Sequence, residues 1–124
     1  MKPKSLLQRL ATSPDLAPFR ELVSPLAEHD RRRGSDLIRT LRVYFACGAN
    51  ASEAADRLWL HRNSLLYRLQ RISDLTGLDL KDPEARLALQ LGLLAMEQKE
   101  RKGEGREAEH PQPAAGNDNR GAEG

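Results

Sequence analysis

The segment NASEAADRLWLHRNSLLYRLQRISDLT, which begins at Asn50, contains two helix starts close together. The first helix must therefore be short, and only a tight turn fits between it and the second helix. Asn50 precedes Glu53 by three positions, which is the spacing of a capping box with Asn in place of the usual Ser or Thr. This spacing predicts a short helix over residues 51–58, a turn over residues 59–61 and a longer helix over residues 62–76. A capped short helix, a tight turn and a second helix in that order favour a helix-turn-helix.

Apolar spacing and helix-end residues mark the other elements. Apolar residues recur at helical spacing through residues 19–26, where Pro25 is expected to end or kink the helix. A second helix is predicted over residues 36–47, with Ser35 as its N-cap. The last helix is predicted to start at the Asp-Pro-Glu of residues 82–84, because the aspartate offers a cap and proline is harmless at the first helical position.

The last predicted helix carries two apolar stripes. One stripe can pack against the core of its own domain, whereas the other would be exposed in a monomer and could bind a second copy. The stripe interpreted as a candidate dimer interface consists of Leu89, Leu93 and Met96. The other stripe consists of Leu87, Leu91 and Leu94.

The composition favours an all-α fold in the form of a small helical bundle. Aromatic residues make up 4% of the chain and hydrophobic residues 39%, so the core must be built largely from leucine and alanine, which favour helices. At 124 residues the chain is expected to be one domain at most, without length for a separate sensing domain.

The single cysteine, Cys47, allows no intrachain disulfide and is expected to be a buried small apolar residue. No apolar run approaches the roughly 20 residues that span a membrane and no signal peptide is recognisable, so a cytoplasmic protein without a membrane partner is expected.

The formal net charge of +2 understates the charge of the folded part. From Glu97 onward there are seven acidic and five basic residues, which leaves 15 bases and 11 acids, a net charge of +4, in residues 1–96. Residues 99–124 are rich in Gly, Glu, Pro, Asn and Ala without a large apolar residue, and they are predicted to be a disordered tail. Residues 1–18 are predicted to be a partly helical extension, and residues 19–98 the folded domain.

The second helix of the predicted helix-turn-helix is basic and polar at its start. Between Arg57 and Arg71 the sequence contains no acidic residue, and such local positive charge binds phosphates by releasing condensed counterions. A recognition helix enters the major groove with its first turn near the base edges. Arg62 can pair with guanine and Asn63 with adenine there, because their fork geometries match those edges. The predicted DNA-binding residues are His61, Arg62, Asn63, Ser64, Tyr67, Arg68 and Arg71, the last four of them as phosphate contacts.

Simpler interpretations apply to several residues. His61 can merely cap the helix that follows it, and Trp59 is expected to pack rather than to bind a ligand. The arginines at positions 31–33 are interpreted as a solvated loop that can also touch phosphate. The three histidines lack ligand-spaced neighbours, so neither a metal site nor a cofactor is predicted. The acidic residues around the start of the last helix are explained by turn and capping roles, so no enzyme activity is predicted. RNA binding is disfavoured, because no exposed aromatic platform for unpaired bases is apparent.

Residues 19–96 resemble the C-terminal helix-turn-helix domain of PucR-type bacterial transcription regulators, which include CdaR-like sugar-diacid regulators. The resemblance rests on LIRTLRVY at 37–44, NASEAA at 50–55, LHRNSLLYRL at 60–69, TGLDL at 76–80 and DPE at 82–84. It implies a Fis-like helix-turn-helix, a recognition helix that starts near His61 or Arg62, and a turn that tolerates a bulky residue. It also implies regulation of transcription, often as a dimer.

The function expected from these features is sequence-specific binding of double-stranded DNA as part of a transcription regulator. A second copy of the chain or a related regulator is the other expected partner, and a dimer would read half-sites about one helical turn, roughly 34 Å, apart. The main alternative is a truncated interaction module that dimerises with full-length relatives through Leu89, Leu93 and Met96 and modulates them. That alternative predicts only weak and unspecific affinity for DNA.

Overall fold

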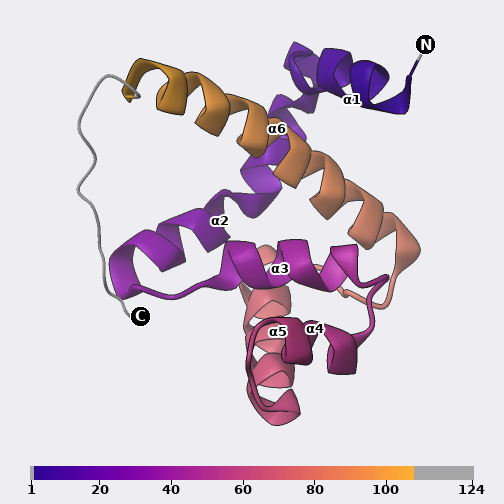
Figure 1. Ribbon diagram of the computed structural model, residues 1–124, viewed down its shortest axis with the longest axis vertical. Helices are drawn as coiled ribbons and strands as arrows, with labels where there is room; N and C mark the ends of the chain where they lie inside the picture. Colours follow the sequence, from indigo (N-terminus) through magenta and orange to yellow (C-terminus); the bar gives the residue numbers. More distant parts are fainter. Residues whose placement is uncertain (1, 108–124) are drawn as a thin grey trace.

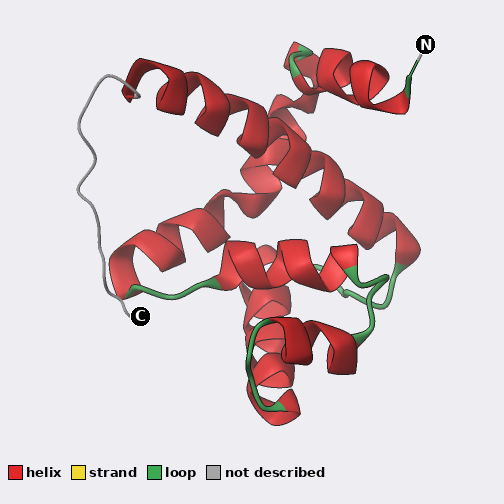
Figure 2. Ribbon diagram, in the orientation of Figure 1, coloured by secondary structure: helices red, strands yellow, loops and turns green. Residues whose placement is uncertain are grey.

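The computed structural model describes residues 2–107, with side chains described through residue 97. This part of the chain forms α-helices joined by short loops, with one 3-10 helix and no strand (Figure 2). The elements in chain order are α1 (Pro3–Ala11), the 3-10 helix η1 (Pro14–Leu16), α2 (Ala17–Arg33), α3 (Leu37–Ala46), α4 (Ala51–Arg57), α5 (Arg62–Thr76) and α6 (Pro83–Glu107). The predicted all-α class is confirmed.

The crossing of α2 and α6 forms the centre of the fold (Figure 1). Helix α3 packs on α2, and α5 packs on both α2 and α3. Helix α4 lies against α5, and these two helices form one end of the molecule, whereas α1 lies at the other end (Figure 1). One continuous core joins α2, α3, α4, α5 and α6, and its fully buried residues include Val23, Leu26, Leu41, Leu65, Ile72 and Leu89.

A glycine allows α2 and α6 to approach closely where they cross. A Cβ atom added at Gly92 would lie 2.4 Å from the backbone oxygen of Phe19 and 3.2 Å from Cγ1 of Val23. Atoms essentially never come as close as the first of these distances, so only glycine fits at this position without a shift of the helices. The position of α6 on α2 therefore depends on this residue.

The crossing also decides which apolar stripe of α6 is inside, and the prediction on this point is wrong. Leu89, Leu93 and Met96 are buried in the core, with exposed fractions of 0%, 7% and 9%, so they are not available as a dimer interface in this fold. Leu87 on the opposite stripe is 57% exposed. The physical reason is that Gly92 lies on the same face as the buried stripe and brings that face against α2.

Helix α2 continues through Pro25, where the sequence predicted an end or a kink, and no end occurs there. Proline lacks the N–H that would bond to the carbonyl of Glu21. The hydroxyl of Ser24 donates a hydrogen bond to that same carbonyl oxygen at 2.9 Å. The acceptor that proline leaves unused is therefore satisfied locally, and α2 runs on to Arg33 before Gly34 ends it.

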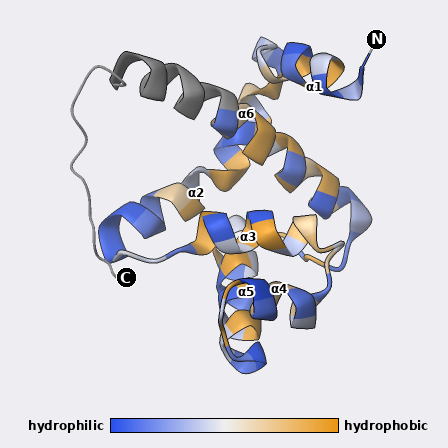
Figure 3. Cartoon of the chain, viewed as in Figure 1, coloured by the Kyte–Doolittle hydropathy of each residue, from blue (hydrophilic) through white to orange (hydrophobic). Residues whose placement is uncertain are grey.

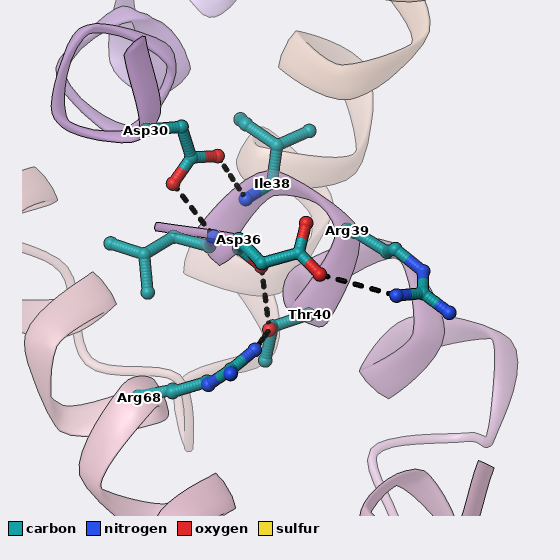
Figure 4. Close-up of polar contacts among 7 residues, drawn as sticks. Asp30, Asp36, Ile38, Arg39, Thr40 and Arg68 are labelled. Atoms are coloured by element: carbon teal, nitrogen blue, oxygen red, sulfur yellow. Dashed lines mark hydrogen bonds and ion pairs between the residues drawn. The ribbon is translucent and has the colours of Figure 1, made fainter. Parts of the chain in front are cut away.

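The N-terminus of α3 is capped by Asp30 of α2. The sequence predicted Ser35 as the cap, and that prediction is wrong. The Asp30 carboxylate accepts hydrogen bonds from the backbone amides of Leu37 at 2.8 Å and Ile38 at 3.0 Å (Figure 4). The Ser35 hydroxyl donates to the same carboxylate. The cap comes from a neighbouring helix, so the turn between α2 and α3 is fastened to the end of α2.

The remaining boundaries concern the two ends of the chain. Residues 1–18, predicted to be a partly helical extension, contain α1 and η1. Helix α6 extends to Glu107, beyond the limit predicted near Gln98, so the predicted tail is helical over its first residues. The rest of the predicted tail, residues 108–124, lies outside the described part of the chain.

Candidate nucleic-acid interface

The helices α4 and α5 start where the sequence predicted, and both starts are capped by side chains. The Asn50 side chain accepts a hydrogen bond from the backbone N–H of Glu53 at 3.0 Å. At the start of α5, Nδ1 of His61 accepts from the backbone N–H of Asn63 at 3.1 Å. His61 is therefore the N-cap of α5, and its Nδ1 atom is occupied by the helix. At the other end of α5, Gly77 has a φ of +73° and its N–H bonds to the Ser73 carbonyl.

The turn between α4 and α5 differs from expectation at Trp59. This residue has a φ of +58° and is 92% exposed, so the prediction that it packs against the core is wrong. The neighbouring Leu60 packs against the core instead, and its N–H bonds to the Ala55 carbonyl at 2.9 Å. A large non-glycine residue in the left-handed region is an outlier that costs conformational energy. The tight turn thus strains the backbone at Trp59 and places its side chain in solvent beside the start of α5.

The two faces of α5 have opposite characters. Leu65, Leu69 and Ile72 are buried in the core. On the opposite face Asn63 is exposed and Tyr67 is 69% exposed. In Figure 3 α4 and the first turn of α5 are mainly hydrophilic, at the end of the molecule farthest from α1. The first turn of α5 is therefore the part of the helix most accessible to a large ligand.

Arg62 is exposed at the start of α5 and is held against α4. Its Nε atom donates a hydrogen bond to the Ser52 hydroxyl at 3.2 Å. This bond uses one edge of the guanidinium group and leaves nitrogens of the other edge unused by the protein. Ser52 lies in the first turn of α4 and can therefore orient the Arg62 side chain.

Arg68 is half-buried and reaches across to α3 (Figure 4). Its Nη1 atom donates to the hydroxyl of Thr40 at 3.1 Å, and that hydroxyl donates to the Asp36 carbonyl at 2.7 Å. Thr40 is the only fully buried polar residue among the largest buried side chains of the described part. One edge of the Arg68 guanidinium thus fastens α5 to α3.

An open groove of about 590 Å³ lies beside α5, between that helix and the segment that joins α2 to α3. We call it the basic groove. One wall comes from α5 and the other from the end of α2, the loop 34–36 and the start of α3. It is lined by His29, Arg33, Gly34, Ser35, Asp36 and Leu37 on one side and by Asn63, Ser64, Tyr67, Arg68 and Arg71 on the other. Five of the seven predicted DNA-binding residues therefore share this groove, whereas His61 and Arg62 lie outside it.

Few carboxylates oppose the positive charge of this surface. Arg57 is paired with Glu53 of the same helix, with 3.2 Å between Nη2 and Oε2. The nearest acid on α5 is Asp74, which accepts a hydrogen bond from Gln70 near the far end of the helix.

The described residues contain no group of three or more His, Cys, Asp or Glu side chains placed to hold a metal ion. None of the described helices has the length and apolar character to cross a membrane.

Sequence reasoning did not identify Ser52 and Thr40 as partners of the site. Their bonds join residues that are ten and 28 positions apart in the chain. The sequence holds no local signal for either contact, because each depends on how one helix packs on another. The sequence placed Arg33 in a solvated loop that can also touch phosphate. The structure places it instead in the last turn of α2, before Gly34 ends the helix, and in the wall of the basic groove.

Comparison with known proteins identifies this arrangement. Residues 37–95 match the family described as the PucR C-terminal helix-turn-helix domain. Residues 37–95 form a PucR-type helix-turn-helix domain. The match runs from the first residue of α3 through most of the described side chains of α6, so it includes α4, the turn and α5. The resemblance predicted from the sequence motifs is confirmed, and the domain is of the type found in DNA-binding transcription regulators.

Several bacterial regulators are similar to this chain. It is 37% identical over 87 residues to the purine catabolism regulatory protein of Bacillus subtilis, an alignment that covers 70% of this chain and 16% of that protein. It is 34% identical over 74 residues to the proline-responsive transcriptional activator PutR of the same organism, covering 60% of this chain and 18% of PutR. It is 42% identical over 74 residues to the carbohydrate diacid regulator of Escherichia coli, covering 59% and 19%. The alignments thus span less than a fifth of each of these relatives, and no solved structure gives a significant match.

Proposed function

We propose that this chain binds double-stranded DNA in a sequence-specific manner and regulates transcription, with the first turn of α5 in the major groove. One observation carries the proposal. The start of α5 is exposed at the end of the molecule formed by α4 and α5, it is polar and basic, and no acidic residue occurs between Arg57 and Arg71. Such a surface attracts the phosphate backbone and presents hydrogen-bonding groups to base edges.

Asn63 and Arg62 are the residues we assign to base recognition. Asn63 lies on the face of α5 opposite the buried leucines, and its amide can bind adenine through two hydrogen bonds. Arg62 keeps one guanidinium edge for guanine while Ser52 holds the other. Ser52 is then a positioning residue, because it limits the conformations of the long Arg62 side chain before DNA arrives.

The other polar residues of α5 are assigned to the phosphate backbone. Ser64, Tyr67 and Arg71 lie further along the flank of the helix, on the side of the basic groove. Arg68 uses one edge for Thr40, and the rest of its guanidinium group can face a phosphate. Contacts of this kind fix the orientation of the domain on the duplex and carry little sequence information. His61 caps α5, so its contribution is to orient the first turn.

Selection of binding sites from random duplex DNA at near-physiological salt tests this proposal. We expect wild-type protein to enrich a defined motif, and a motif repeated in inverted orientation would indicate that two copies bind together. Arg62→Ala should weaken binding to the selected site by about 1–3 kcal/mol and relax the preference at one base pair. Arg71→Ala should instead weaken the selected and the scrambled duplex alike.

Lys4→Ala is the charge-matched control, because Lys4 is exposed on α1 at the opposite end of the molecule. It removes one positive charge without touching the proposed interface, so its affinity should stay close to that of the wild type. A folded protein that enriches no motif would refute sequence-specific binding. An equal loss for Arg62→Ala on selected and scrambled DNA would refute the assignment of Arg62 to a base.

A further inference from the structure

We propose that the basic groove binds the phosphate backbone of the same duplex that α5 reads, with Arg33 as a contact from outside the helix-turn-helix. The inference rests on the proposed function and extends its interface to the end of α2. It assigns a role to one member of the run Arg31-Arg32-Arg33 and distinguishes it from the other two.

The charges that line the groove favour an anion. Arg33, Arg68 and Arg71 bring three guanidinium groups to it. The side chains of Arg33 and Arg71 form no hydrogen bond or ion pair with any residue in the described part. The groove contains one carboxylate, Asp36, and that group is paired with Arg39 at 3.2 Å. A phosphate would therefore meet two arginines that the protein leaves unpaired.

The three consecutive arginines at the end of α2 are not equivalent. Arg31 is paired with Glu28 at 2.6 Å, and Arg32 lies 3.9 Å from the same carboxylate. The hydrogen bond from Arg31 holds the pKa of the Glu28 carboxyl below its ordinary value. Neither Arg31 nor Arg32 lines the basic groove, whereas Arg33 does. The last turn of α2 thus directs one arginine toward α5 and uses the other two beside Glu28.

The position of the groove also fits the path of a DNA strand. A helix in the major groove has a phosphate strand along each of its flanks, because that groove is only about 12 Å wide. One flank of α5 is occupied by α4 through the contact between Arg62 and Ser52. The other flank carries Arg68 and Arg71 and opens into the basic groove. The strand on this second flank would therefore pass between α5 and Arg33.

The wall that carries Arg33 is held in place. Asp30 ties the turn to α3, and Nδ1 of His29 lies 2.7 Å from the Ser35 hydroxyl. Gly34 ends α2 with a φ of +67°, a conformation that glycine adopts without strain. A fastened wall loses less conformational freedom on binding than a mobile loop would, which favours it as a phosphate contact.

The test compares Arg33→Gln with Arg31→Gln in the full chain. Both residues are exposed, both lie in the last turn of α2 and both substitutions remove one positive charge, but only Arg33 lines the groove. Binding is measured against a labelled duplex carrying the selected motif and a scrambled duplex of the same length, over a series of salt concentrations. Circular dichroism confirms that each variant is folded.

We expect Arg33→Gln to weaken binding to both duplexes by the same factor. The slope of log affinity against log salt should fall by about 0.9, the value for one phosphate contact. The ratio of wild-type to variant affinity should consequently shrink about 3.5-fold between about 50 mM and about 200 mM salt. Arg31→Gln should leave the slope unchanged, and Arg33→Lys should restore most of it because lysine keeps the charge.

The outcomes separate this inference from the proposed function. Wild-type binding with an unchanged slope in Arg33→Gln would overturn the role of the basic groove and leave DNA binding by α5 intact. The same slope change in Arg33→Gln and Arg31→Gln would also overturn it, because the effect would then be one of general charge. No binding of either duplex by the folded wild-type protein would refute the proposed function, and the inference with it.

Discussion

Replacing Gly92 by alanine is expected to destabilise the fold, although the substitution should favour the helix on its own. Alanine is about 1 kcal/mol better than glycine in a helix interior. At this position, however, the new Cβ would lie 2.4 Å from the backbone oxygen of Phe19. Ordinary contact begins near 3.4 Å, so α2 and α6 would have to separate by about 1 Å along that line. A backbone oxygen cannot rotate away as the end of a flexible side chain can.

The size of the effect follows from these two terms. Overpacking costs about 1–3 kcal/mol, and a clash with backbone atoms places this case at the upper end. After the helix preference of alanine is subtracted, the free energy of unfolding should fall by about 2 kcal/mol, which lowers the melting temperature by roughly 10 °C for a domain of this size. Urea unfolding followed by circular dichroism measures it, with the exposed Gln90→Ala on the same helix as a control. Stability equal to or above that of the wild type would refute the close approach of α2 and α6.

Two further predictions concern the turn and the cap of α3. Trp59→Gly should raise the free energy of unfolding by about 0.5–1 kcal/mol. Glycine removes the cost of about 1–2 kcal/mol that a bulky residue has in the left-handed conformation, but part of this gain is lost because glycine makes the unfolded chain more flexible. A decrease in the same unfolding assay would mean that Trp59 packs after all. Asp30→Ala should lower the free energy of unfolding by about 2 kcal/mol, because the Ser35 hydroxyl and the first two amides of α3 would lose the carboxylate that accepts their hydrogen bonds. Amide hydrogen exchange should then become faster at the first residues of α3, and unchanged protection there would contradict the capping role.

The starts of α4 and α6 were predictable because their signals are local. The Asn50 side chain bonds three positions ahead, and the Asp82 side chain bonds to the amide of Glu84 two positions ahead. Each of these bonds forms as soon as the helix next to it forms, whatever the rest of the fold does. The start of α3 was predicted to within one residue, but its cap was assigned to Ser35 for the opposite reason. Its cap, Asp30, lies seven positions away from the first amide it accepts from and belongs to another helix.

The inner face of α6 was the least predictable part of the fold. Both stripes are apolar, so hydrophobicity alone does not distinguish them, and the burial of Leu89 is decided by the crossing with α2. A signal was nevertheless present in the sequence. Ala85 and Gly92 lie on the same helical face as Leu89, and small residues let two helix backbones approach closely. The stripe beside the small residues was therefore the better candidate for the core.

In the candidate interface too, the charges were visible in the sequence, whereas the contacts between helices were not. Sequence reasoning could nominate Arg62, Arg68 and Arg71, because a run without acids is visible in the sequence. It could not show that the first two share their guanidinium groups with hydroxyls of α4 and α3, while the side chain of Arg71 has no partner in the described part. That difference matters for function. Arg62 is held by Ser52 at the exposed start of α5, so it is oriented before DNA arrives and suits the reading of a base, whereas the unpaired Arg71 adapts to the phosphate that comes nearest. Arg62 and Arg71 are therefore expected to differ in specificity rather than in charge.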